Sequence, residues 1–215
     1  MLATTETLLD RGLGDRVFTE QSLTCIFEGS PAKRYSLVNK ALKKGELIRL
    51  HRGIYMLAPK YRSEQINVFS VANRMVPGSF VSFETALALH GWIPERVNLI
   101  MSVIVKGRTK SFHTPLGDFY YVKVPLRHED SLEGVTWHVS NNQTFLMANP
   151  LRALADYVYL RKIVWTDLDF LLEGMRIDEE NLRSLTTKDF DDISGIHHSK
   201  RVLFFLENLR KSLEQ

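Results

Sequence analysis

A helix with clear signals at both ends, followed at once by a tight hairpin, constrains the fold of this chain more than any other feature. Ser30 is a good N-cap residue, and Pro31 suits the first helical position, where its missing N–H leaves no hydrogen bond unmade. Gly45 suits the position after the helix because glycine adopts the left-handed backbone without a side-chain clash. The sequence therefore predicts a helix that starts at Ser30–Pro31 and continues to Lys44.

Two short apolar runs follow this helix and read as strands, at residues 46–50 and 54–57. Between them, His51-Arg52-Gly53 predicts a three-residue hairpin loop with glycine at the position that needs positive φ. Two short helices are predicted before the long one, at residues 4–11 and 20–27. Short helices, then a basic helix, then a basic hairpin is the order of elements in a winged helix-turn-helix.

Positive charge is concentrated in the same part of the chain. The formal net charge of all 215 residues is only +3, yet residues 31–62 hold nine cations against one acid, Glu46. A surface with this excess attracts polyanions. An ordinary small domain with a solvated cationic face would have a similar composition, but the order of elements favours double-stranded DNA as the partner. The cations are Lys33, Arg34, Lys40, Lys43, Lys44, Arg49, Arg52, Lys60 and Arg62.

The first half of the basic helix is the part that usually reaches base edges in such domains. Arg34 and Asn39 have forked side chains suited to guanine and adenine, and the choice between Asn39 and Ser36 as a base contact stays open. Tyr35 either contacts a phosphate or packs inward. The basic side chains of the hairpin are expected at phosphates or in a minor groove. The candidate DNA-binding residues are Lys33, Arg34, Tyr35, Ser36, Asn39, Lys40, Lys43, Arg49, His51 and Arg52.

Residues 1–60 are therefore predicted to form the DNA-binding domain, and residues 64–215 a second, mixed α/β domain. At the entry to this second domain, Ser63 is expected to cap a helix to about Val76, and within the domain Ser82 is expected to cap a helix to His90. The predicted fold class is α+β. Further strands are expected at residues 97–105, 119–124, 136–139 and 144–148, and further helices at 149–161, 166–173, after 178, and 199–213.

No catalytic, metal-binding or cofactor-binding constellation stands out, so none is predicted. The histidines form no HxxxH pair, and the apolar neighbours of the single cysteine, Cys25, predict a buried, inert thiol. No phosphate-binding glycine loop is present. Asp167 and Asp169 have the spacing of nucleotidyltransferase ligands but lack the upstream Gly-Ser turn, so they are interpreted as acids of a first helical turn. The chain has no apparent signal peptide or membrane span, which predicts a cytoplasmic protein without a membrane partner.

Four motifs, in order along the chain, resemble the AbiEi family of antitoxins and transcriptional regulators. They are LIRLHRGIY at 47–55, FVSFETALALHGWIP at 80–94, GRTKSF with TPLGDF at 107–112 and 114–119, and NPLRALAD at 149–156. Where the family pattern has Pro-Glu-Lys-Ala, this chain reads Pro150-Leu151-Arg152-Ala153. The resemblance implies a type IV antitoxin that binds inverted repeats in its own promoter. It also implies a C-terminal domain that counters a nucleotidyltransferase-like toxin without forming a stable complex with it.

Two alternatives accompany this hypothesis. One is a stand-alone regulator whose C-terminal domain binds a ligand or a partner, and the other is a nuclease or nucleotidyltransferase guided to DNA by the winged helix. One winged helix covers about half of a typical operator, so a dimer or cooperative binding is expected on DNA.

Overall fold

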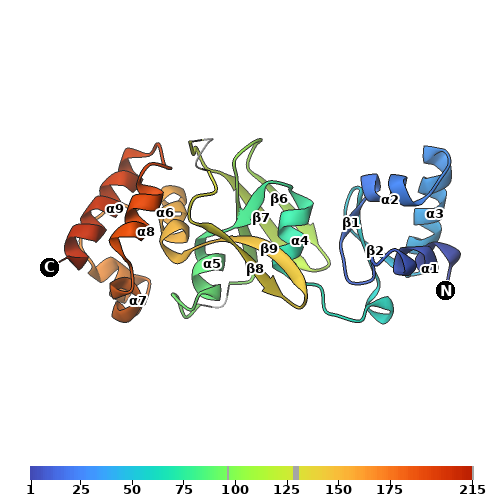
Figure 1. The fold of residues 1–215 in the computed structure, drawn as a ribbon, viewed down its shortest axis with the longest axis horizontal. Helices are drawn as coiled ribbons and strands as arrows, with labels where there is room; N and C mark the ends of the chain where they lie inside the picture. Colours follow the sequence, from blue (N-terminus) through green and yellow to red (C-terminus); the bar gives the residue numbers. More distant parts are fainter. Residues whose placement is uncertain (96, 128–130, 215) are drawn as a thin grey trace.

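The computed structural model describes residues 1–95, 97–127 and 131–214, and its fold is mixed α+β. The N-terminal part combines three helices with an antiparallel sheet whose strand order is β1-β3-β2. Figure 1 shows its helices at one end of the molecule. Its elements are α1 (Ala3–Asp10), β1 (Phe18–Thr19), α2 (Glu20–Ile26), α3 (Pro31–Lys43), β2 (Leu47–His51) and β3 (Ile54–Leu57).

The predicted basic helix is present as α3, and its start is confirmed by the cap. The Ser30 hydroxyl accepts a hydrogen bond from the Lys33 N–H at 3.3 Å, and Pro31 occupies the first position. The prediction of a three-residue hairpin loop is wrong, because His51 belongs to β2 and pairs with Ile54. A bulge at Leu50 takes up the extra residue, which leaves a two-residue turn.

The small sheet packs on both of its faces. One face buries Phe18, Tyr55 and Leu57 against the helices of the N-terminal part. The opposite face contributes Leu50 and Met56 to the apolar core of the rest of the chain. The N-terminal part is therefore attached to the remainder by buried apolar contacts as well as by the chain itself.

A six-stranded mixed sheet forms the centre of the molecule, with strand order β6-β7-β5-β4-β9-β8. The pairs β5/β7 and β4/β9 are parallel and the others are antiparallel. The sequence predicted β5, β7, β8 and β9 but missed β4, which is very short, and β6, which is a polar edge strand. The strands are β4 (Ser79–Val81), β5 (Leu99–Ile104), β6 (Lys110–Thr114), β7 (Gly117–Lys123), β8 (Val135–Ser140) and β9 (Gln143–Ala148).

Helices flank this sheet, and the last three lie at the end of the molecule opposite α1–α3 (Figure 1). Helix α6 agrees with the predicted helix at 149–161, and Asn149 caps it through the Arg152 N–H at 2.8 Å. The sequence missed α8. The helical elements are η1 (Pro59–Tyr61), α4 (Val68–Met75), α5 (Phe83–Leu89), α6 (Pro150–Arg161), η2 (Phe170–Gly174, a π-helical turn), α7 (Glu179–Arg183), α8 (Thr187–Ser194) and α9 (Lys200–Leu213).

Two predicted helix starts are wrong. Ser63 does not cap a helix, because its N–H and hydroxyl donate to the Asp15 carboxylate. Helix α4 begins five residues later at Val68, where Asn67 accepts the Phe69 N–H at 2.8 Å. The helix expected from Thr166 is replaced by the π-helical turn η2, so Asp167 does not sit in a first helical turn.

Gly134 provides a test of packing behind β8. Its φ is +68°, and a Cβ there would lie 3.0 Å from the Arg152 Cβ and 3.0 Å from the Ile193 Cγ2. We expect Gly134→Ala to lower the free energy of unfolding by about 2–4 kcal/mol, measured by urea denaturation, because backbone strain and overpacking add. Gly78→Ala is the matched control, since its φ is +81° and nothing lies within 4 Å of its Cβ position. Equal losses in the two variants would contradict the packing argument.

Candidate nucleic-acid interface

Helix α3 presents a polar face to solvent at the end of the molecule (Figure 1). Ser36, Lys40 and Lys43 are exposed and Asn39 is half-buried, and helical spacing places these four residues on one side. Together with Lys44 and Tyr35 they line a surface hollow. The structure thus brings half of the candidate DNA-binding residues together on one continuous face.

Tyr35 belongs to this exposed face. Its side chain is 69% exposed, so it does not pack inward. The opposite side of α3 buries Val38 and Ala41 against the N-terminal core, while Leu37 and Leu42 are half-buried. The predicted apolar stripe therefore anchors the helix and leaves the polar face free.

Arg34 lies outside the exposed polar face that the other candidates on α3 form. Its position, four residues before Val38 and seven before Ala41, places it toward the buried side of the helix. Its Nη1 donates a hydrogen bond to the Gly29 carbonyl at 2.5 Å. The guanidinium is therefore held against the loop that precedes α3, whereas Lys33 is exposed in the first turn.

The positive charge of residues 31–62 is only weakly compensated by acids elsewhere in the described ranges, where Arg62 helps to lower the pKa of Asp15. None of its nine cations forms an ion pair there. Glu46, the one acid of the segment, is buried and accepts hydrogen bonds from the Leu2 N–H at 2.9 Å and the Thr5 hydroxyl at 2.5 Å. These hydrogen bonds lower the pKa of Glu46, so its carboxylate stays ionised but faces inward. The cations outside remain available to a polyanion.

The β2–β3 hairpin contributes two exposed arginines but is not free at its tip. The Arg49 guanidinium lies 5.7 Å from the centroid of the Tyr55 ring, and Arg52 is exposed at the turn. The His51 ring, in contrast, lies 4.5 Å from the ring of Phe112 in β6. His51 therefore makes an intramolecular contact with the large sheet.

The single thiol lies on the outside of the N-terminal part. Cys25 is exposed on α2, so the prediction of a buried thiol is wrong. Its neighbours Leu23 and Ile26 pack into the core of the N-terminal part. Cys25 lies between them in the sequence, but the turn of the helix directs it to the solvent-exposed side. An apolar sequence neighbourhood does not imply burial when the element is a helix.

A second cluster of functional-type side chains is fully buried in the C-terminal part. Arg152 and Asp156, one turn apart on α6, are both 0% exposed, and the Arg152 Nε lies 3.2 Å from the Asp156 Oδ1. The Ser82 hydroxyl donates to the Asp156 Oδ2 at 2.7 Å. The His197 Nε2 lies 3.2 Å from the Asp156 Oδ1. Ser82 therefore occupies the N-cap position of α5, as predicted, but its side chain binds a carboxylate and makes no capping hydrogen bond.

Electrostatics around Asp156 favour its charged form. Burial alone would raise the pKa of Asp156, but the Arg152 guanidinium, with His197 and the Ser82 hydroxyl, lowers it below its ordinary value. Arg152 also donates to the Glu133 carbonyl at 2.7 Å. Since these groups join α6 to the segments before α5, β8 and α9, the cluster is a structural link, and sequence reasoning missed it.

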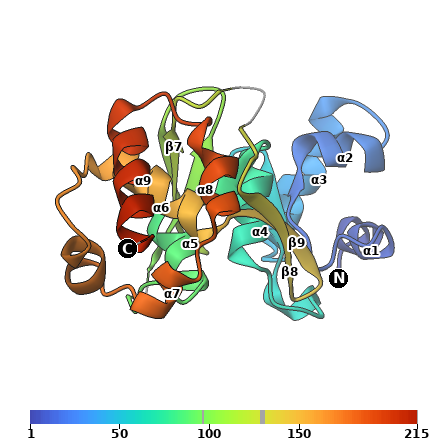
Figure 2. The same cartoon turned by 60° about the vertical axis from the view of Figure 1, so that its left-hand side comes forward.

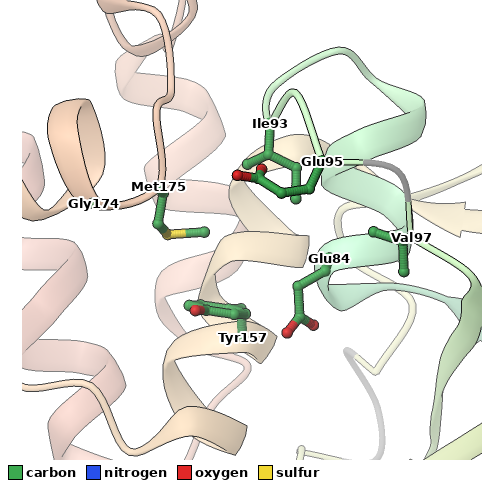
Figure 3. A pocket seen from close by; sticks show the side chains of 7 residues that line it. All are labelled: Glu84, Ile93, Glu95, Val97, Tyr157, Gly174 and Met175. Carbon is green, nitrogen blue, oxygen red and sulfur yellow. The ribbon is translucent and has the colours of Figure 1, made fainter.

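A cavity of about 210 Å³ lies near η2 and contains two carboxylates (Figure 3). Glu84, in the first turn of α5, pairs with Arg161 at 2.5 Å, and Glu95 pairs with Arg176. Burial and the neighbouring carboxylates raise the pKa of Tyr157, whose ring lines the same cavity as Met175 and the two carboxylates. Each carboxylate pairs with an arginine, an arrangement typical of structural ion pairs, but the Glu84 Oε2 is buried without a hydrogen-bond partner among the described residues. The lining residues are Glu84, Ile93, Glu95, Val97, Tyr157, Gly174 and Met175.

No family model and no curated protein sequence matches the chain. Across the described ranges, three or more His, Cys, Asp or Glu side chains nowhere gather in a way that could hold a metal ion. Within the same ranges, the helices are too short or too polar to cross a membrane.

Proposed function

We propose that this protein is a non-enzymatic, DNA-binding repressor of the antitoxin type, whose N-terminal part works as a winged helix-turn-helix. The observation that carries the proposal is the exposed face of α3, with Lys40 and Lys43 free of ion pairs in the part of the chain that the structure describes. Thirteen helical residues span about 20 Å, a length that fits the major groove. The order of α2, α3 and the basic hairpin supports the same function.

In the proposed complex, α3 reads bases while basic side chains around it contact phosphates. We assign Ser36 and Asn39 to base edges, since both lie on the polar side of α3 among its exposed lysines. Lys33, Lys40 and Lys43 surround them, and Arg49 with Arg52 extends the cationic surface onto the hairpin. Arg34 supports the loop before α3 and His51 supports the hairpin, so neither is assigned a base contact.

The resemblance to AbiEi antitoxins supports the biological setting of this proposal. The protein would bind inverted repeats in its own promoter as two copies, since one unit covers about half of an operator. It would counter a nucleotidyltransferase-like toxin without a stable complex, and it would act in the cytoplasm without a cofactor. A stand-alone regulator with a ligand-binding C-terminal part is the second candidate, and a polar pocket between α4 and the β8–β9 hairpin favours it. An adjacent toxin gene would distinguish the first candidate from the second.

Binding to the duplex upstream of the protein's own gene tests the proposal. If three to five phosphates are neutralised per subunit, log K is expected to fall with log[salt] at a slope of about −3 to −4.5, measured by fluorescence anisotropy. Asn39→Ala should cost about 1–3 kcal/mol on the best site and relax the preference at one base pair. Binding that is independent of salt, or equal on unrelated sequences for all variants, would contradict the proposal.

A further inference from the structure

Two adjoining pockets lie where the N-terminal part, the linker after β3 and the β8–β9 hairpin meet. The smaller pocket, of about 190 Å³, is lined by Arg16 and Val17 before β1, Ser70 and Arg74 of α4, and residues 142–144 of the hairpin. Figure 2 shows this hairpin beside the linker. The wall of the pocket thus combines three segments that are far apart in the sequence.

Hydrogen bonds hold the hairpin and the linker in register around the pocket. Gln143 accepts a hydrogen bond from the Asn67 N–H at 3.1 Å and donates one to the Gln65 carbonyl at 3.0 Å. Asn141 and Asn142 have φ values of 50° and 54°, as in the two-residue turns whose twist matches a hairpin. The position of the Asn142 side chain at the pocket therefore follows from a well-defined turn.

The chemistry of the smaller pocket is that of an anion site. Arg16 and Arg74 form no ion pair within residues 1–95, 97–127 and 131–214, and the lining of this pocket contains no acidic side chain. Ser70 and Thr144 add hydroxyl groups and Asn142 adds an amide, all of which can donate hydrogen bonds. The guanidinium fork binds phosphate oxygens in pairs, so two arginines with three neutral donors suit a phosphate group.

The larger pocket, of about 460 Å³, shares Arg16, Asn142 and Gln143 with the smaller one. It continues along the linker, where Tyr61 and Leu9 supply an aromatic and an apolar wall. Glu64 also lines it, and its carboxylate can accept hydrogen bonds from hydroxyl groups. The Asp15 carboxylate in the same wall already accepts hydrogen bonds from the N–H and hydroxyl of Ser63 and from the Glu64 N–H. A cationic end and an end with aromatic and hydroxyl-binding groups match a phosphate attached to a sugar or a ring.

We propose that this junction binds a small phosphate-bearing molecule, with the phosphate held by Arg16 and Arg74 and the uncharged part lying along the linker beside Tyr61. The bound molecule contacts the segment before β1 together with α4 and the hairpin. It therefore connects the part of the chain that carries α3 to the large sheet. The inference goes beyond the proposed function and is tested without DNA.

Calorimetric titration of the full chain with adenosine 5′-monophosphate and ribose 5-phosphate tests the site. We expect a Kd between about 10 µM and 1 mM for at least one of the two, and at least tenfold weaker binding of uncharged adenosine. Arg16→Ala and Arg74→Ala should each weaken binding at least about tenfold, because each removes a charge-assisted pair of hydrogen bonds. Asn142→Gly keeps the turn and should weaken binding a few-fold. Arg201→Ala, an exposed arginine on α9, is the matched control and should bind as the unmodified chain does.

The outcomes separate this site from the DNA interface. Absence of binding to both phosphate compounds up to about 10 mM would overturn the inference, as would binding that survives both arginine substitutions. If Arg16→Ala and Arg74→Ala weaken duplex binding while neither compound binds, the arginines belong to the DNA contact and the inference fails. If the chain binds a phosphate compound but does not bind its promoter, the result supports the inference and rejects only the proposed function.

Discussion

Arg152→Met is expected to lower the free energy of unfolding by about 3–5 kcal/mol, because it leaves the fully buried Asp156 carboxylate without its cationic partner. The Arg152 guanidinium also lies 5.0 Å from the centroid of the Phe80 ring. Its removal leaves the Glu133 carbonyl without the hydrogen bond that Arg152 donates. Urea denaturation followed by circular dichroism measures the loss. The methionine fills much of the arginine stem's volume, so the change reports mainly on charge and hydrogen bonding.

A double substitution separates the pair from its surroundings. Arg152→Met with Asp156→Leu removes both charges, and replacement of a buried ion pair by apolar groups is often close to neutral. We therefore expect the double variant to be more stable than Arg152→Met alone. If the losses in free energy of unfolding from the two substitutions add in the double variant, the ion pair does not govern the stability of this region. Packing around α6 then governs it.

The pH dependence of stability follows from the direction of the Asp156 shift. Its folded pKa lies below the ordinary value of 3.8, so the stabilisation is fully present above that value and is lost as pH falls through the folded pKa. The unmodified chain should therefore lose stability steeply below about pH 4, whereas Asp156→Asn should show a shallower acid slope. Parallel acid slopes for the two proteins would contradict the assignment.

Local signals in the sequence predicted the elements that present the candidate interface. Ser30, Pro31 and Gly45 mark the ends of α3 through short-range hydrogen bonding and backbone freedom, and the period of Val38 and Ala41 indicates its buried side. These effects act within a few residues, so they can be recognised without knowing the rest of the fold. The same holds for α6, which begins after Asn149.

Long-range contacts explain what the sequence did not reveal. The His51 ring contacts Phe112, which lies in a strand that was not predicted, so its position depends on how the two sheets pack. Arg152 and Asp156 have the spacing of an exposed helical ion pair, and only Ser82 and His197, from distant segments, make it a buried cluster. Charged residues are rarely fully buried, so the local sequence pattern predicts a solvent-exposed position for a pair that is in fact buried.

Reversing two charges on α3, in Lys40→Glu with Lys43→Glu, is expected to weaken promoter binding at least about a hundredfold at 0.1 M salt. The two lysines are exposed and free of ion pairs in the ranges that the structure describes, so their substitution should leave the Tm almost unchanged. Loss of two phosphate contacts should also make the salt slope shallower by about 1.8. Anisotropy titrations over a range of salt concentrations measure both effects.

Lys200→Glu with Arg201→Glu is the matched control for this prediction. Both residues are exposed on α9, at the opposite end of the molecule from α3, and the change in net charge is identical (Figure 1). Because screening limits the reach of a surface charge to about 10 Å at 0.1 M salt, this variant should bind within about threefold of the unmodified chain. If both double variants lose the same affinity for DNA, the affinity depends only on the net charge of the protein, and α3 is not the interface. A large loss confined to the α3 variant would place the duplex against the face formed by Ser36, Asn39 and their lysine neighbours.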